Sequence, residues 1–144
     1  MNILEMSALE QSTAIAEGQI SSETLTRFYL DRIEAQNEAL QAFATVTPKL
    51  ALKAAERCDA ERQSRDRRDL PLFHGVPVGI KDLVPTRGIR TRMGSRAYRY
   101  FVPPIDGTVV KRIAAGGFVS LGKLSTSEFG VLPVTEPLIH PPTR

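Results

Sequence analysis

A lysine ends an apolar run near the middle of the sequence. Residues 74–83 read HGVPVGIKDL, a type of run that usually enters a core, where an ammonium ion is costly to bury. If the run forms a strand, Lys81 shares one face with Pro77 and Gly79, whereas the valines and the isoleucine take the other face. Because the lysine face carries little side-chain bulk, another backbone segment can approach it closely. We therefore expect Lys81 to lie in a confined, partly dry slot.

Such a slot would suit Lys81 to acid–base chemistry. Desolvation lowers the pKa of a lysine, so that a neutral amine, and hence a general base, becomes accessible near neutral pH. The alternative is a lysine just past the end of the strand that pairs with Asp82 or with another acid. The pattern alone leaves both interpretations open.

Few other residues compete for a chemical role. No carboxylate pair, phosphate loop or cysteine cluster is evident, and His74 has no partner at metal-ligand spacing. We expect His74 to be a packing residue that makes a hydrogen bond. Asp82 is expected to orient its strand or a neighbouring loop by accepting from backbone N–H groups, and Asp106 to cap a helix.

Composition narrows the class of protein. The chain has 144 residues, of which 42% are hydrophobic and 24% charged, as in one ordinary globular domain. A single cysteine, Cys58, excludes an internal disulfide. The segment densest in charged residues, 56–69, mixes acidic and basic side chains almost evenly, so it does not indicate nucleic-acid binding. Without a signal peptide or an apolar span of about 18 residues, we expect a cytoplasmic protein with no membrane or nucleic-acid partner.

The first half of the sequence predicts helices. Ser7 and Glu10 form a capping box, and Gly18 suits the end of that helix. Ser21 can cap a second helix with an apolar stripe, and Pro48 suits the first turn of a third. Residues 1–69 are therefore expected to form a helical layer and a charged linker.

The second half predicts an α/β arrangement. Residues 72–81 read as a strand, 108–117 as a short helix and 118–124 as a second strand, separated by glycine-rich turns. Within the helix, four residues are expected to face inward: Val109, Val110, Ile113 and Ala114. Residues 130–144 contain four prolines and no periodicity, which suggests a chain cut off in mid-fold.

The order and spacing of these motifs resemble the amidase signature family. The resemblance runs from about Leu72 to Phe129 and rests on HGVPVGIKDL, GIRTRMGSRAY and VPPIDGTVVKRIAAGGFVSLGKLSTSEFG. It implies an α/β fold: N-terminal helices, then the first strands and helix of a mixed-sheet α/β/α fold, incomplete at the C-terminus. Residues 1–144 would be the N-terminal part of a single domain, with residues 70–144 starting its catalytic core.

The resemblance also implies an activity and a role for Lys81. Members are hydrolases that act on carbon–nitrogen bonds other than peptide bonds, through a Ser–cis-Ser–Lys triad in which Lys81 matches the lysine. A serine attacks the amide carbonyl and forms an acyl-enzyme, the lysine takes the proton by way of the bridging serine, and water hydrolyses the ester. The implied substrate is a small-molecule amide, with no metal and no organic cofactor.

One part of the family's pattern is missing. Both family serines lie in a Gly/Ser-rich stretch that this sequence does not contain, so we expect the 144 residues to be inactive alone. Ser125, Thr126 and Ser127 stand beside Lys123, but the matching family segment lines the approach to the site and does not supply the nucleophile. These three residues are expected to contact substrate, and Lys123 is a less favoured alternative base.

Three functions stay open on the sequence. The first is a stand-alone amidase, and the second is the glutaminase A subunit of an aminoacyl-tRNA amidotransferase. The third is a non-catalytic binding or dimerisation module whose N-terminal helices pair with another chain, a homo-oligomer included. The proline-rich end speaks against the module, because strands at a break would expose unpaired edges.

Overall fold

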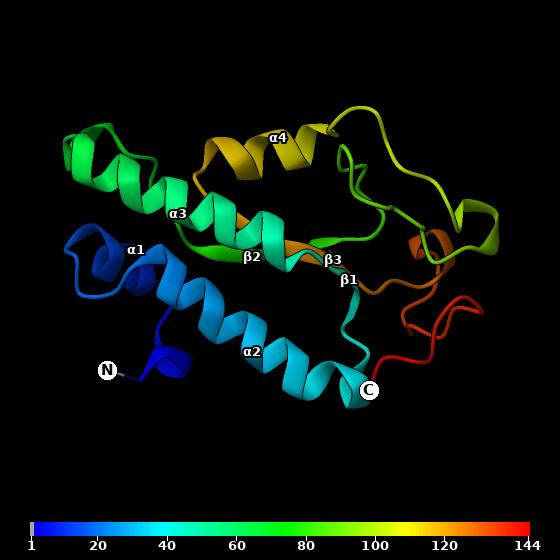
Figure 1. Ribbon diagram of the computed structural model, residues 1–144. Coiled ribbons are helices and arrows are strands. Elements are labelled where there is room, and N and C mark those ends of the chain that lie inside the picture. Colours follow the sequence, from blue (N-terminus) through cyan, green and yellow to red (C-terminus); the bar gives the residue numbers. More distant parts are fainter. Residues whose placement is uncertain (1) are drawn as a thin grey trace. The chain divides into compact units, whose positions relative to one another are not determined.

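A computed structural model describes residues 2–144 of the chain. Figure 1 labels its α-helices and β-strands and colours them in sequence order. The α-helices and strands are, in chain order, α1 (Ala8–Ala16), α2 (Ser22–Leu40), β1 (Phe43–Val46), α3 (Pro48–Ser64), β2 (Pro77–Lys81), α4 (Thr108–Ala115) and β3 (Val119–Leu124). Short 3-10 helices cover Ile3–Glu5, Arg67–Asp69, Arg96–Tyr98 and Glu128–Gly130.

The three strands form one mixed sheet in the order β1-β3-β2. Strand β1 pairs antiparallel with β3, with Thr45 opposite Lys123. The Val119 N–H donates to the Val76 carbonyl over 2.9 Å near one end of β2, and the Asp82 N–H donates to the Leu124 carbonyl over 2.9 Å at the other. Both predicted strands are present, but β2 covers only the second half of the range predicted for it, because residues 72–75 form turns. The prediction of a purely helical first half was wrong, because β1 lies between α2 and α3.

The composition of β2 explains how it fits into the sheet. The strand begins at Pro77, where a missing N–H is tolerated. A Cβ atom built on Gly79 would come within 2.8 Å of the Leu124 side chain, so any larger residue there would require Leu124 to shift. A side chain, and not the expected backbone segment, therefore makes the close approach to this face.

The predicted helix termini are confirmed. The Glu10 N–H donates to Ser7 Oγ over 3.3 Å, and the Ser7 N–H donates to the Glu10 carboxylate over 2.6 Å. Gly18 follows α1 with a φ of +73°, a conformation that glycine adopts without strain. Ser21 Oγ accepts from the Thr24 N–H at the start of α2, and Pro48 opens α3.

Two predictions around α4 were wrong. Val110 is buried and Ile113 is partly buried, but Val109, at 52%, and Ala114 are exposed. Asp106 does not cap α4; its carboxylate accepts from the Arg87 N–H over 2.7 Å. The side chain therefore ties a distant loop to the chain just before α4.

The chain divides into two compact units. Unit 1 comprises the chain up to Asp31, Thr47–Val78 and Ile113–Leu121. Unit 2 comprises Arg32–Val46, Gly79–Arg112 and Gly122–Arg144. These boundaries differ from the division expected at residue 69, and the assignment of all 144 residues to a single domain stays a prediction.

Unit 1 has an apolar core. The partly buried rings of Phe73 and Phe118 pack against this core. The two rings are stacked, with centroids 4.6 Å apart. His74 is 5% exposed, and its Nε2 lies 2.9 Å from the Cys58 carbonyl, which confirms its predicted packing role. The buried cluster consists of Ala14, Ile15, Ile20, Leu25 and Val76.

Along residues 2–144, none of the helices combines the length and the apolar character needed to cross a membrane.

One carboxylate in unit 1 caps a helix from outside it, and this generates a stability prediction. Asp59 on α3 accepts from the first N–H groups of α2, those of Ser22 and Glu23, over 2.8 and 3.0 Å. Replacing Asp59 with alanine leaves both donors without this partner, so we expect the free energy of unfolding to fall by about 1 to 2 kcal/mol.

Urea denaturation of wild type and Asp59→Ala measures this change. The control is Asp31→Ala, which removes an exposed carboxylate from the middle of α2. Equal stability of the two variants would contradict the capping role.

Candidate functional site

Lys81 is the last residue of β2, and its side chain is exposed. Its carbonyl accepts from the Val84 N–H over 3.0 Å, which closes a turn directly after the strand. The expectation of a confined slot was wrong for the described residues. Leu124 covers the preceding Gly79, but the lysine at the end of the strand stays accessible. Its role as a general base stays a prediction.

Asp82 fixes the chain next to Lys81. It is 1% exposed, and its N–H bond to Leu124 holds the end of β2 against β3. The Asp82 carbonyl accepts from the Met93 N–H over 3.0 Å, and its Oδ2 accepts from the Arg92 N–H over 3.2 Å. The predicted use of Asp82, to orient a loop through backbone N–H groups, is confirmed.

Lys123 is the buried lysine of unit 2. Its side chain is fully buried in β3. The ammonium donates to the Val84 carbonyl, to Thr86 Oγ1 over 3.0 Å and to Thr91 Oγ1 over 3.1 Å. Asp82 Oδ1 lies 4.0 Å from Lys123 Nζ. An ammonium has three N–H donors, so every one of them is occupied.

Burial changes the pKa of both Lys123 and Asp82 in the direction that favours the neutral form of each. Desolvation lowers the pKa of Lys123 from 10.5 to about 8, and the attraction of Asp82 opposes this only in part. Desolvation also raises the pKa of Asp82, against the Arg92 N–H bond and the positive charges of Lys123 and Arg92. The lowered pKa that was predicted for Lys81 is therefore found at Lys123, which still carries its proton for most of the time at pH 7.

Access separates the two lysines. Lys123 has no exposed surface, so a substrate cannot reach its amine to transfer a proton in this conformation. Lys81 is exposed at the end of β2. The next residue, Asp82, is fixed by backbone hydrogen bonds to Leu124 and Met93. The geometry therefore favours a structural role for Lys123 and leaves Lys81 as the candidate general base.

The three hydroxyl residues after β3 are buried. Ser125 Oγ donates to the Gln41 carbonyl over 2.6 Å, and Ser127 Oγ donates to the Leu132 carbonyl over 3.0 Å. Thr126 Oγ1 has no partner among residues 2–144. The structure thus uses two of these hydroxyls to fix neighbouring loops, and their contact with substrate stays a prediction.

Sequence reasoning missed the residues that surround Lys123. Thr86 and Thr91 are 5% and 0% exposed, although both stand in the arginine-rich, polar segment after β2. The available signal was Lys123 itself, a lysine inside a β-branched and apolar strand, because such a charge requires several acceptors nearby.

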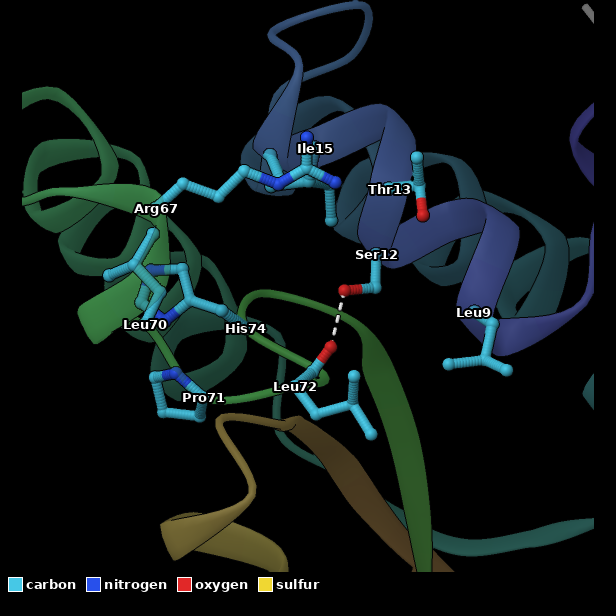
Figure 2. A pocket seen from close by; sticks show the side chains of 10 residues that line it. Leu9, Ser12, Thr13, Ile15, Arg67, Leu70, Pro71, Leu72 and His74 are labelled. Carbon is cyan, nitrogen blue, oxygen red and sulfur yellow. Dashed lines mark hydrogen bonds between the residues drawn. The ribbon is translucent and has the colours of Figure 1, made fainter.

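A cavity elsewhere in the chain does not add a catalytic group. A cavity of about 160 Å³ in unit 1 is lined by residues of α1 and of the segment from Arg67 to His74 (Figure 2). Ser12 Oγ donates to the Leu72 carbonyl at its edge, and Arg67 lies 3.6 Å from the Glu17 carboxylate.

Over residues 2–144, no group of three or more His, Cys, Asp or Glu residues is placed to hold a metal ion.

Comparisons with a family profile, with curated sequences and with solved structures all point to one family. The sequence profile described as Amidase matches residues 24–144. The chain is 43% identical over 131 residues to the A subunit of the glutamyl-tRNA(Gln) amidotransferase of Geobacter sp. (strain M21), across 91% of this chain and 26% of that protein. It therefore spans about a quarter of that relative's length.

Solved structures share the fold. The peptide amidase from Stenotrophomonas maltophilia matches at 33% identity with a TM-score of 0.78, over 87% of this chain and 26% of that one. A chain from a vestigial protein complex that reveals the evolutionary origins of an s-triazine catabolic enzyme matches at 31% identity with a TM-score of 0.90, over 96% of this chain and 30% of that one. The predicted α/β fold is confirmed.

The lowered pKa of Lys123 predicts a pH dependence of stability. The unfolded chain keeps this proton to about pH 10.5, whereas the folded chain releases it near pH 8. Because the unfolded state binds more protons between these values, the contribution of Lys123 to the free energy of unfolding rises as the pH rises through that window.

Thermal or urea unfolding at intervals between pH 7 and pH 10 tests this for wild type and Lys123→Met. The difference in stability, wild type minus variant, is expected to grow with pH. The control is Lys111→Met, which removes an exposed lysine of α4. A difference for Lys123→Met that stays flat over the window would contradict the assignment.

Proposed function

This chain belongs to the amidase signature family, and on that premise we propose that the whole protein hydrolyses a linear amide through a serine acyl-enzyme, with Lys81 as the general base. The observation that carries the assignment is an accessible amine at the end of a fixed strand. Lys81 is exposed, while the N–H and C=O groups of the next residue, Asp82, are bonded to Leu124 and Met93. A general base requires this combination of access and fixed position.

The proposed reaction follows the family's serine–lysine logic. The nucleophilic serine loses its proton to the bridging serine as that serine passes its own proton to the Lys81 amine. The serine oxygen attacks the amide carbon, the C–N bond breaks, and the proton returns through the bridging serine to the leaving amine. Water then hydrolyses the ester. We propose that sequence outside these 144 residues supplies both serines and desolvates Lys81.

Lys123 fits this role less well, although its pKa is already lowered to about 8. Its amine is enclosed by Val84, Thr86 and Thr91, so proton transfer would require the loop after β2 to open. Lys81 needs only the desolvation that a covering segment and a bound substrate provide. We therefore assign the base to Lys81.

The test is substitution of Lys81 by methionine in the whole protein. We expect kcat/KM for amide hydrolysis to fall by about 10²- to 10⁴-fold, the usual contribution of a general base, with a melting temperature close to wild type. The matched control is Lys111→Met, an exposed lysine of α4, which should keep wild-type activity. A folded Lys81→Met protein with wild-type activity would overturn the assignment.

A second candidate function is the glutaminase component of a tRNA-dependent amidotransferase. The observation that favours it is the 43% identity to the A subunit of a glutamyl-tRNA(Gln) amidotransferase. In that role the same serine–lysine chemistry would release ammonia from glutamine for use by a partner chain. The partner would then control turnover, whereas a stand-alone amidase requires none.

Ammonia release separates the two functions. The whole protein is assayed with glutamine and with simple linear amides, alone and together with the remaining subunits of a glutamyl-tRNA(Gln) amidotransferase. Our first proposal predicts turnover of a linear amide without added subunits. Glutamine hydrolysis that requires them would support the second. Absence of activity under all conditions would favour a non-catalytic binding module.

A further inference from the structure

We propose that Lys123 is a positioning residue for Lys81: its buried ammonium holds the turn that follows β2 and thereby sets the direction in which Lys81 leaves the sheet. This inference rests on the proposed function of Lys81. It concerns a different side chain, which the predicted triad does not use, and it rests on a chain of contacts within unit 2.

The first contact joins the two lysines through one residue. Val84 donates its N–H to the Lys81 carbonyl over 3.0 Å. The carbonyl of the same residue accepts from Lys123 Nζ. Both backbone polar groups of Val84, the N–H and the C=O, are therefore hydrogen-bonded. A shift of Lys123 would move the turn that begins at Lys81.

The second set of contacts fixes the loop beyond that turn. Thr86 and Thr91 both place their Oγ1 atoms on Lys123 Nζ. Each hydroxyl also donates to a nearby carbonyl, Thr86 to Val84 and Thr91 to Ile89, over 3.2 Å in both cases. One ammonium group thus hydrogen-bonds to three residues of the segment from Val84 to Thr91.

The third contact is electrostatic. Asp82 Oδ1 lies 4.0 Å from Lys123 Nζ and has no hydrogen-bond partner among residues 2–144. The charged groups that face Asp82 are Lys123, Arg92 and His140. Removing the ammonium would leave a buried carboxylate with less compensation, directly next to Lys81 in the chain, and such groups are costly.

Strand β3 completes the support. Leu124, the neighbour of Lys123, accepts the Asp82 N–H and packs its side chain over Gly79. Two consecutive residues of β3 therefore hold the strand before Lys81 and the turn after it. Since a misplacement of about 1 Å can cost about 10²-fold in rate, loosening either support should lower the rate of the chemical step.

The test uses small changes that keep the fold. In the whole protein, Thr86→Val and Thr91→Val each remove one acceptor of Lys123 without changing side-chain shape. We expect each to lower kcat about tenfold, with KM within about twofold of wild type. Thr86→Ser keeps the hydroxyl and should restore kcat. The control Thr108→Val alters an exposed threonine at the start of α4 and should leave kcat unchanged.

A double-variant cycle links the effect to Lys81. In a Lys81→Met background, Thr86→Val and Thr91→Val should have no further effect on the residual rate. Losses of kcat that persist in that background, or wild-type kcat in both folded threonine variants, would overturn this inference. Wild-type activity of Lys81→Met alone would instead overturn the proposed function, so the two failures are distinguishable.

Discussion

The local structure around Lys81 depends on the burial of one ammonium group, that of Lys123. Taking such an ion out of water costs several kcal/mol, and the cost is met only when good hydrogen bonds and opposite charge surround it. In unit 2 the acceptors come from Val84, Thr86 and Thr91, with the Asp82 carboxylate at 4.0 Å. A segment without regular secondary structure is thereby ordered by a polar contact instead of an apolar core.

The two lysines show that a shifted pKa and a catalytic role are separate properties. A strongly perturbed group in a cleft is a reasonable candidate for a functional site, and by that criterion alone Lys123 would be selected. However, its donors are all occupied, and it has no exposed surface. Lys81 is accessible and is held at its carbonyl by the Val84 N–H. Access and position, considered before titration, therefore favour Lys81 as the residue that meets a substrate.

Local patterns in the sequence predicted the parts of the fold that local physics controls. The capping box at Ser7, the glycine after α1 and the alternation in β2 follow from interactions within a few residues. Strand β1 was missed because its four residues are defined only by pairing with β3, far along the chain. The acceptors of Lys123 were missed for the same reason: nothing in a polar loop indicates that Thr86 and Thr91 converge on a buried amine. The exposure of Lys81 likewise depends on what covers the end of β2, which alternation alone does not determine.

The neutral character of the Lys123 acceptors has a consequence for the loop after β2. A simple ion pair would weaken when its lysine loses a proton, and Lys123 does so near pH 8. A carbonyl and two hydroxyls behave differently, because a neutral amine still has two donors and gains a lone pair. A threonine hydroxyl that now donates to a neighbouring carbonyl can turn and donate to that lone pair. The hydrogen bonds that hold the loop after β2 can therefore persist when Lys123 loses its proton, whereas the attraction between Lys123 and the Asp82 carboxylate is lost.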